Sequence, residues 1–208
     1  MTGNADTSVI SANEDGAAMR GPIIISRHGK PALNRDAGPR ITWQEYVEWW
    51  ANYEIGGLEQ GQEPAEKLIA DVADAKIVLT SGRLRAQQTA AMAAAHMTAI
   101  PDDLYNEATL PPPRWTFTRF KPRTWNKYAR AAWMLGHSLG GETVKEANVR
   151  ATVAAEALHA HAEAGKVYLA AHGWFNRMIR RELRQIGWKC TYNGGDSYWS
   201  YRKYEWQL

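Results

Sequence analysis

The sequence predicts a three-layer α/β/α sandwich with a mostly parallel central sheet. Three short apolar runs, each followed by small or polar residues, lie at residues 23–25, 76–79 and 166–171. Runs of this length that are apolar without interruption are typical of strands buried on both faces of a parallel sheet. Segments with helical periodicity lie between the runs. Because strands that alternate with helices indicate parallel pairing, helices are expected to cover both faces of the sheet.

The expected helices are recognised by their apolar spacing and by the residues that end them. Residues 64–74 place three aliphatic side chains on one helix face. In residues 143–164 the apolar residues recur at helical spacing, and Gly165 follows as a C-cap. The expected helices span residues 64–74, 85–97, 125–135, 143–164 and 175–186.

The chain of 208 residues fits one domain, assigned to residues 21–208. Residues 1–20 are polar and lack the basic and apolar segments of a secretory signal, so they are expected to be a disordered lead-in. Residues 34–61 and 110–125 break the alternation of strands and helices, and the second contains four prolines. Because proline is excluded from helix interiors and central strands, both segments are expected to be loop or lid insertions. A membrane-surface role for the aromatic and basic residues of 115–123 is the alternative.

Composition argues against several classes of protein. The formal net charge of +3 is too small to indicate a nucleic-acid partner. No apolar run approaches the roughly 18 residues that span a bilayer, so stable membrane insertion is not expected. The single cysteine, Cys190, allows no internal disulfide and favours a reducing compartment, so the cytoplasm is the expected location. The oligomeric state stays open, with a dimer among the options.

Reactive side chains follow each of the three expected strands. Arg27 and His28 follow the first strand, residues 80–82 and then Arg85 follow the second, and His172 follows the third. Ligands of a parallel α/β sheet bind beyond the carboxyl ends of its strands, so these side chains are expected to converge. A neutral imidazole is a nucleophile near pH 7, and guanidinium groups match phosphate oxygens. The pattern predicts a phosphate site with His28 as its nucleophile.

Cleavage of a phosphate ester also needs an acid that protonates the leaving alcohol. Glu107 is the candidate, since it follows a short strand-like run at residues 103–106 and precedes the proline-rich segment. Glu45, Glu48 and Glu142 are the alternatives. No spacing of His, Cys and Asp matches a structural zinc site, so no metal is expected.

The order of these residues resembles the motif blocks of the histidine phosphatase superfamily. The blocks that carry the resemblance are Arg27-His28-Gly29 with Asn34, residues 81–90 around Arg85, Tyr105-Asn106-Glu107, Gly141-Glu142 with Arg150, and His172-Gly173. They run in order from about residue 23 to about residue 183, which is most of the chain. Lys30 and Gly82 depart from the acidic residue and the proline that are common at these positions in the family.

The resemblance implies a phosphoglycerate mutase-like fold and a phosphatase that works through a phosphohistidine on His28. Glu107 is implied to act first as an acid and then as a base toward water, and His172 to share in catalysis. The residues implied to bind the phosphoryl group are Arg27, Arg85, His172, Asn34 and Gly173. No metal and no cofactor are implied. The implied substrate is a small-molecule phosphate ester, with a phosphoprotein as the alternative.

Three other functions stay open at this point. A phosphoglycerate mutase-type phosphotransferase would share the fold, and a catalytically silent phosphate-ester-binding module would keep the same blocks. Residues 136–140 also match the Gly-x-Ser-x-Gly motif of esterases, with Ser138 as the nucleophile. That motif requires a strand before the serine and a helix directly after it. Because residues 125–135 have helical spacing, a turn between two helices is favoured there.

Overall fold

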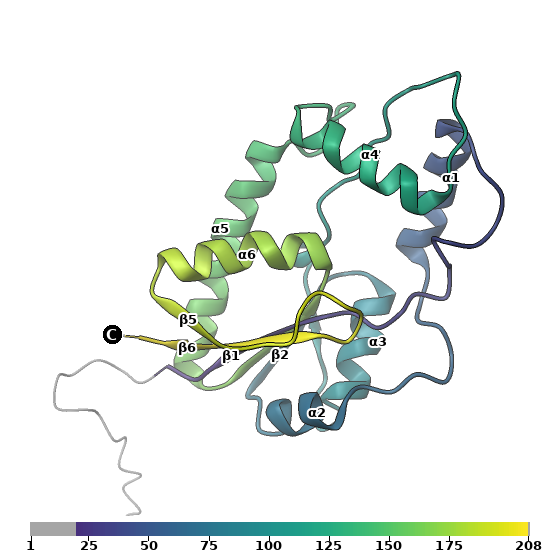
Figure 1. Ribbon diagram of the computed structural model, residues 1–208. Helices are drawn as coiled ribbons and strands as arrows, with labels where there is room; N and C mark the ends of the chain where they lie inside the picture. The colour runs from purple at the N-terminus through teal and green to yellow at the C-terminus, as the bar shows by residue number, and fades with distance from the viewer. Residues whose placement is uncertain (1–19, 208) are drawn as a thin grey trace, which may run out of the picture.

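A six-stranded sheet forms the centre of the computed structural model, which describes residues 20–207 (Figure 1). The strands are β1 (Ile23–Arg27), β2 (Ile77–Thr80), β3 (Ile100–Pro101), β4 (Val167–Ala171), β5 (Trp188–Asn193) and β6 (Tyr201–Trp206). They lie in the order β3-β2-β4-β1-β6-β5, in which β1 to β4 are mutually parallel and β5 and β6 pair antiparallel. The lead-in expected at residues 1–20 lies outside the described residues, except for Arg20.

Helices cover both faces of this sheet. They are α1 (Trp43–Ile55), α2 (Glu66–Val72), α3 (Leu84–Ala93), α4 (Pro122–Met134), α5 (Val144–His161) and α6 (Gly173–Gln185). Helices α5 and α6 pack on one face, and α2 and α3 pack on the other. The predicted three-layer α/β/α sandwich is therefore confirmed. Of the helices in residues 20–207, none has the length and apolar character needed to cross a bilayer.

The central strands are buried on both faces, which explains why their sequences are apolar without alternation. Ile23 and Ile25 of β1 belong to the core cluster under α5 and α6, whereas Ile24 belongs to the cluster under α2 and α3. All three are between 0% and 4% exposed. Successive side chains of a strand point to opposite faces, so both clusters require apolar residues from the same short run.

The two antiparallel strands, β5 and β6, were not among the expected elements. In β6, Tyr201 and Tyr204 are buried, but Arg202 and Lys203 between them are partly exposed. Strands at this side of the sheet meet solvent, so charged residues interrupt their apolar pattern. The uninterrupted apolar run that marks β1, β2 and β4 is for that reason absent from β5 and β6.

The expectation of loop insertions at residues 34–61 and 110–125 is wrong in part, because helices lie in both segments. Helix α1 begins with a capping box, in which the Thr42 hydroxyl accepts from the Glu45 N–H at 3.3 Å. The Glu45 carboxylate accepts from the Thr42 N–H in return, at 2.6 Å. Helix α4 begins at Pro122, where the missing N–H of proline has no cost because the first turn leaves its N–H groups unpaired.

Aromatic side chains join α1 to α4 beside the main sandwich (Figure 1). The Tyr46 ring on α1 is fully buried, with its centroid 6.1 Å from that of Trp49 and 5.9 Å from that of Trp125. The indole N–H of Trp125 donates to the carbonyl of Ile41 at 2.8 Å. Many of the tryptophans therefore serve packing, and they fix α1 against α4.

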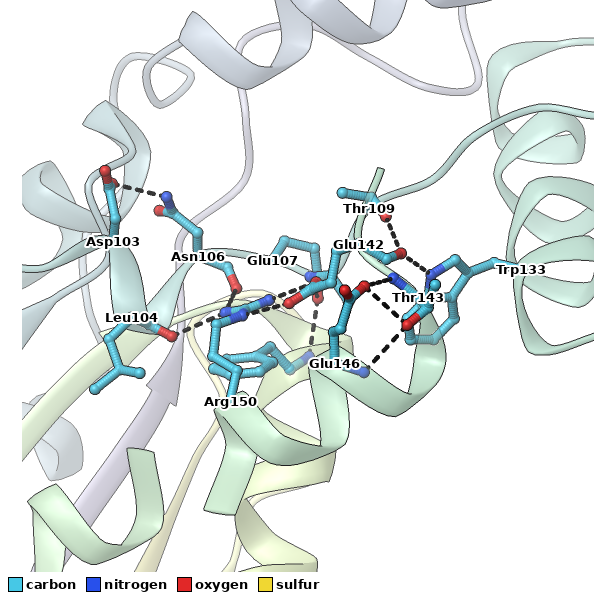
Figure 2. Close-up of polar contacts among 12 residues, drawn as sticks. Asp103, Leu104, Asn106, Glu107, Thr109, Trp133, Glu142, Thr143, Glu146 and Arg150 are labelled. Atoms are coloured by element: carbon cyan, nitrogen blue, oxygen red, sulfur yellow. Dashed lines mark hydrogen bonds and ion pairs between the residues drawn. The ribbon is translucent and has the colours of Figure 1, made fainter. Parts of the chain in front are cut away.

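Arg150 of α5 ties the segment before residue 107 to the helical layer (Figure 2). Its guanidinium forms a two-pronged ion pair with Glu142, with distances of 2.6 and 2.8 Å. Its Nη1 donates to the carbonyls of Leu104 and Asn106, each at 2.8 Å. The guanidinium also lies 3.8 Å from the ring centroid of Phe175. One side chain thus connects α5, α6 and the loop that carries Glu107.

We expect Arg150→Ala to lower the free energy of unfolding by about 2–4 kcal/mol, because it leaves Glu142 and two carbonyls without their partner. Arg150→Lys should lose less, since it keeps the charge but not the planar fork. Urea unfolding monitored by tryptophan fluorescence measures both changes. Arg119→Ala is the control, because its ion pair with Glu45 is exposed and should contribute far less to stability. Equal losses in the Arg150→Ala and Arg119→Ala variants would contradict this account.

Candidate active site

His28 lies immediately after β1, where its main-chain N–H donates to the carbonyl of Ala171 in β4 at 2.9 Å. The side chain is 3% exposed. Its Nδ1 lies 2.7 Å from the carbonyl oxygen of Gly29. A carbonyl oxygen has no proton to give, so Nδ1 carries the proton and Nε2 keeps its lone pair. The ring is therefore held in the tautomer that has a nucleophilic Nε2.

His172 follows β4, the strand beside β1, and its ring centroid lies 5.1 Å from that of His28. Its Nδ1 is 3.4 Å from Nη2 of Arg85, and its Nε2 is 2.7 Å from the hydroxyl of Ser81. A guanidinium can only donate, so Nδ1 accepts and Nε2 carries the proton that is donated to Ser81. His172 thereby links the end of β2 to the start of α3.

Arg85 is 1% exposed and is held by the C-terminal end of α1. Its Nη1 donates to the carbonyls of Tyr53 and Glu54, at 2.9 and 3.1 Å. Its Nη2 donates to the Glu54 carboxylate at 2.8 Å. Within residues 20–207 its Nε is buried and has no hydrogen-bond partner. One N–H of this fixed guanidinium is therefore free to bind an acceptor.

Arg27, the last residue of β1, is held in a similar way by the loop between β5 and β6. Its Nη1 donates to the carbonyl of Asp196 at 2.6 Å, and the guanidinium lies 4.3 Å from the ring centroid of Tyr198. Its Nε likewise has no partner among the residues that the structure describes. A Cβ atom on Gly173 would lie 3.2 Å from this Nε, so the glycine leaves room for Arg27 at the start of α6.

Burial and positive charge keep the two histidines neutral. Burial, and then the charges of Arg85 and Arg27, hold the pKa of His28 well below its usual value. Burial, and then the charge of Arg85 and the neighbouring His28, lower the pKa of His172 in the same direction. Both rings are consequently uncharged near pH 7, and the positive charge around them resides on the arginines.

Glu107 lies against the N-terminus of α6, although Trp174, which it contacts there, is 67 residues further along the chain. Its carboxylate accepts from the N–H groups of Trp174 and Phe175, at 3.1 and 2.9 Å. The N–H of Ala108 donates to it as well, at 3.0 Å. The strand-like run expected before Glu107 is wrong: Asp103–Tyr105 form a turn of 3₁₀ helix, capped by the side chain of Asp102. The negative carboxylate suits the positive end of the α6 dipole.

The alternative acids lie in other settings. Glu142 is committed to the ion pair with Arg150, and Glu45 caps α1 from an exposed position. Glu48 is exposed on α1 and lines neither of the cavities beside Arg27. Ser138 lies in a turn between α4 and α5, with no strand before it, so the nucleophile elbow of esterases is excluded.

Two cavities of similar size have the Arg27 side chain in their walls. The Asn34 cavity, of about 480 Å³, is lined by Arg27, Lys30, Asn34, Arg35, Asp196 and Tyr198 among others. The α4 cavity, of about 510 Å³, is lined by Arg27, Glu107, Gly173 and the facing side of α4. Asn34 itself is exposed, and its side-chain oxygen accepts from the N–H of Asp36 at 2.8 Å. His28, His172 and Arg85 line neither cavity.

Sequence reasoning missed the residues that hold the arginines. Tyr198 lines the Asn34 cavity, and its ring centroid is 5.7 Å from that of His28. Arg35 donates to its hydroxyl at 2.7 Å. Asp196 and Glu54, which bind Arg27 and Arg85, also carry no motif. Only Gly194-Gly195 signalled a turn near Tyr198, without indicating where that turn would fold.

Metal ligands are not gathered in this region. Within residues 20–207, no group of three or more His, Cys, Asp or Glu side chains is arranged to hold a metal ion. The polar groups around His28 are instead N–H donors and neutral imidazoles, which suit an anion.

Comparisons with known proteins agree with this picture. A family model, the histidine phosphatase superfamily (branch 1), matches residues 23–205. Similar solved structures include the product of open reading frame Rv3214 from Mycobacterium tuberculosis, with 18% identity and a TM-score of 0.53 over 90% of this chain and 96% of that chain. The mycobacterial glucosyl-3-phosphoglycerate phosphatase has 18% identity and a TM-score of 0.52, over 91% and 96% of the two chains.

Phosphoserine phosphatase from Entamoeba histolytica shares 14% identity with a TM-score of 0.55, over 79% of this chain and 80% of that chain. No curated protein sequence matches the chain. At these identities the solved structures show a common fold alone, whereas the family model spans nearly all of the described residues. The chain therefore belongs to the histidine phosphatase superfamily.

Proposed function

We propose that this protein is a phosphatase that hydrolyses a phosphate monoester through a phosphohistidine on His28. The observation that carries the proposal is the state of the His28 ring. The carbonyl of Gly29 holds the proton on Nδ1, so Nε2 has a free lone pair, and burial beside two arginines keeps the ring neutral. The unpaired Nε–H donors of Arg27 and Arg85 supply positive contacts for phosphate oxygens.

In the first step, Nε2 of His28 attacks phosphorus, an N–P bond forms and the ester P–O bond breaks. Glu107 enters this step in its protonated form, gives its proton to the leaving oxygen and becomes the carboxylate that the N–H groups at the start of α6 stabilise. Arg27 and Arg85 stabilise the charge that develops on the phosphoryl oxygens. His172 holds Nη2 of Arg85 and, being neutral, adds no positive charge of its own.

In the second step, water attacks phosphorus and gives a proton to the Glu107 carboxylate. The N–P bond breaks, inorganic phosphate leaves and His28 returns to its neutral form. Glu107 lines the α4 cavity, which opens beside Arg27, so water can reach the carboxylate. This access favours hydrolysis over the phosphotransfer of a mutase, which requires a site closed to water.

Two of the similar structures support the class of reaction by their own activities. One is a glucosyl-3-phosphoglycerate phosphatase and the other is a phosphoserine phosphatase. Both are phosphatases of small phosphate esters. A small-molecule phosphate ester is accordingly the proposed substrate here, with a phosphoprotein as the alternative.

We expect His28→Ala to reduce phosphate release from p-nitrophenyl phosphate by at least about a thousandfold, because the covalent step is lost. Rapid quench should trap an acid-labile, base-stable phosphoenzyme in the wild type and none in the variant. His96→Ala is the matched control, since His96 is exposed, lies outside both cavities and should leave activity unchanged. An active His28→Ala variant would exclude the phosphohistidine route.

Because the pKa of His28 is held low, its ring stays neutral when the pH falls through 6.5, the usual pKa of histidine. We therefore expect no loss of kcat/KM from protonation of His28 in that pH range. Imidazole ¹⁵N NMR should show proton on Nδ1 and no titration of His28 down to about pH 6. Below about pH 6.5 these two histidines, His28 and His172, bind protons in the unfolded chain but stay neutral in the folded one. The free energy of unfolding should therefore fall as the pH is lowered through that value. A His28 ring that titrates near pH 6.5 would refute the assignment.

Glu107→Gln should lower kcat by about 10²–10⁴ for an alkyl phosphate, whose leaving oxygen needs a proton, but far less for p-nitrophenyl phosphate. The ratio of the two rates is the measurement, because a merely structural defect would lower both rates alike. Glu142→Gln, at the alternative acid, should leave that ratio at its wild-type value. Equal losses with both esters in Glu107→Gln would remove Glu107 as the general acid.

A further inference from the structure

The side of α4 that faces the α4 cavity is basic. Arg123, Lys127 and Arg130 lie four and three residues apart, so they share one face of the helix. All three line the cavity, whose other wall contains Arg27 and Glu107. The cavity therefore runs from the proposed phosphoryl end of the site to the basic face of α4.

The charges that line this cavity do not balance. Six cationic side chains face it, against the two carboxylates of Glu107 and Asp196. Of the six, only Arg123 and Arg177 pair with a carboxylate within residues 20–207: Arg123 with Asp36 at 2.8 Å and Arg177 with Asp196 at 2.9 Å. The remaining four are Arg27, Arg35, Lys127 and Arg130.

Three of those four cations lie outside the proposed phosphoryl contacts. Arg35 donates to the hydroxyl of Tyr198 and pairs with no carboxylate among the residues that the structure describes. Lys127 is exposed and has no carboxylate within 4 Å in the described part of the chain. The ester phosphate is proposed to bind at Arg27 and Arg85, so Arg35, Lys127 and Arg130 add positive charge beside it.

Arg130 shows that this surplus is built into the fold. Its guanidinium lies over the rings of Trp133 and Trp174, at 4.8 and 4.9 Å from their centroids. Among residues 20–207 it donates to main-chain carbonyls alone, those of Ala108 and Thr109, at 3.0 and 3.2 Å. Burial lowers its pKa, which reflects a cation that is withdrawn from water without a paired anion. An anion in the α4 cavity would offset that desolvation.

We infer that the substrate carries a second anionic group, a carboxylate or a second phosphate, which binds at the basic face of α4. The inference rests on the proposed phosphatase function and names the class of ester that the site selects. The ester phosphate binds at Arg27 and Arg85, and the second anion binds at Lys127 and Arg130. A cavity of about 510 Å³ is within the range that holds small metabolites.

Matched ester pairs test the inference. 3-Phosphoglycerate and glycerol 3-phosphate differ only in a carboxylate that replaces a CH₂OH group. Glucose 1,6-bisphosphate and glucose 6-phosphate differ in a second phosphate. In one pair, the wild type should have a kcat/KM at least about tenfold higher for the ester that carries a second anionic group than for the ester that carries the phosphate alone. The pair that shows the preference identifies the second anion as a carboxylate or a phosphate.

Lys127 is the residue to change, because it is exposed and its replacement does not disturb the core. Lys127→Gln should lower the ratio of the two kcat/KM values within that pair about three- to tenfold, and Lys127→Glu should lower this ratio further. Lys145→Gln is the matched control: Lys145 is an exposed helical lysine that lines neither cavity, so both rates should stay unchanged. Raising the salt concentration should weaken the preference of the wild type but not that of Lys127→Glu.

The failures of the two proposals give different results. If the wild type hydrolyses the esters with equal kcat/KM within both pairs, the second-anion inference is overturned while the phosphatase function stands. The same holds if a preference exists but Lys127→Gln leaves it intact. If no ester is hydrolysed by the wild type, the phosphatase function falls and the inference falls with it.

Discussion

His28 and His172 emerge side by side because β1, β4 and β2 are paired in a strict parallel register. Arg27 of β1 lies opposite Ala171 of β4, and Thr80 of β2 lies opposite Ala170. The next residue along each strand therefore leaves the sheet at the same edge. A shift of one residue in either pairing would exchange the two faces for every side chain of the shifted strand and would move the histidine that follows it along the sheet edge. The register of the buried strands thus also sets the 5.1 Å between the two ring centroids.

The arginines beside these rings are fixed by their own partners before any ligand binds. Arg85 is fixed by the end of α1, and Arg27 by the loop between β5 and β6. Fixed donors lose little conformational entropy on binding and need little reorganisation when charge develops nearby. Burial, and then these same positive groups, hold the pKa of His28 low, so one arrangement of charge suits both an anion and the proposed nucleophile. Glu107, the proposed acid, is held separately, by the N-terminus of α6 and by the loop that Arg150 fixes.

The parts of this arrangement that the sequence could predict are those encoded by local pattern. Three apolar runs predicted the strands, and the residues that follow them predicted which side chains converge. The Thr-x-x-Glu signal at Thr42 is the same as the one at Thr143, yet the Trp- and Tyr-rich composition around it suggested an insertion and obscured α1. Tyr198 and Glu54 could not be predicted, because their contacts join segments far apart in the chain and depend on the finished fold. Strands β5 and β6 were missed because their solvent-facing residues interrupt the apolar pattern.

The contact between Arg85 and the carbonyls that end α1 limits how this enzyme can be re-engineered. Helices α1 and α4 pack together through their aromatic side chains and suggest a detachable cap that could be exchanged between related proteins. The two helices are nevertheless unequal in this respect. Residues on the cavity side of α4, such as Lys127, can be exchanged to change the proposed substrate preference, because the contacts that hold Arg85 come from α1. The last turn of α1 would have to be exchanged together with α3, because Tyr53 and Glu54 on α1 hold Arg85 on α3.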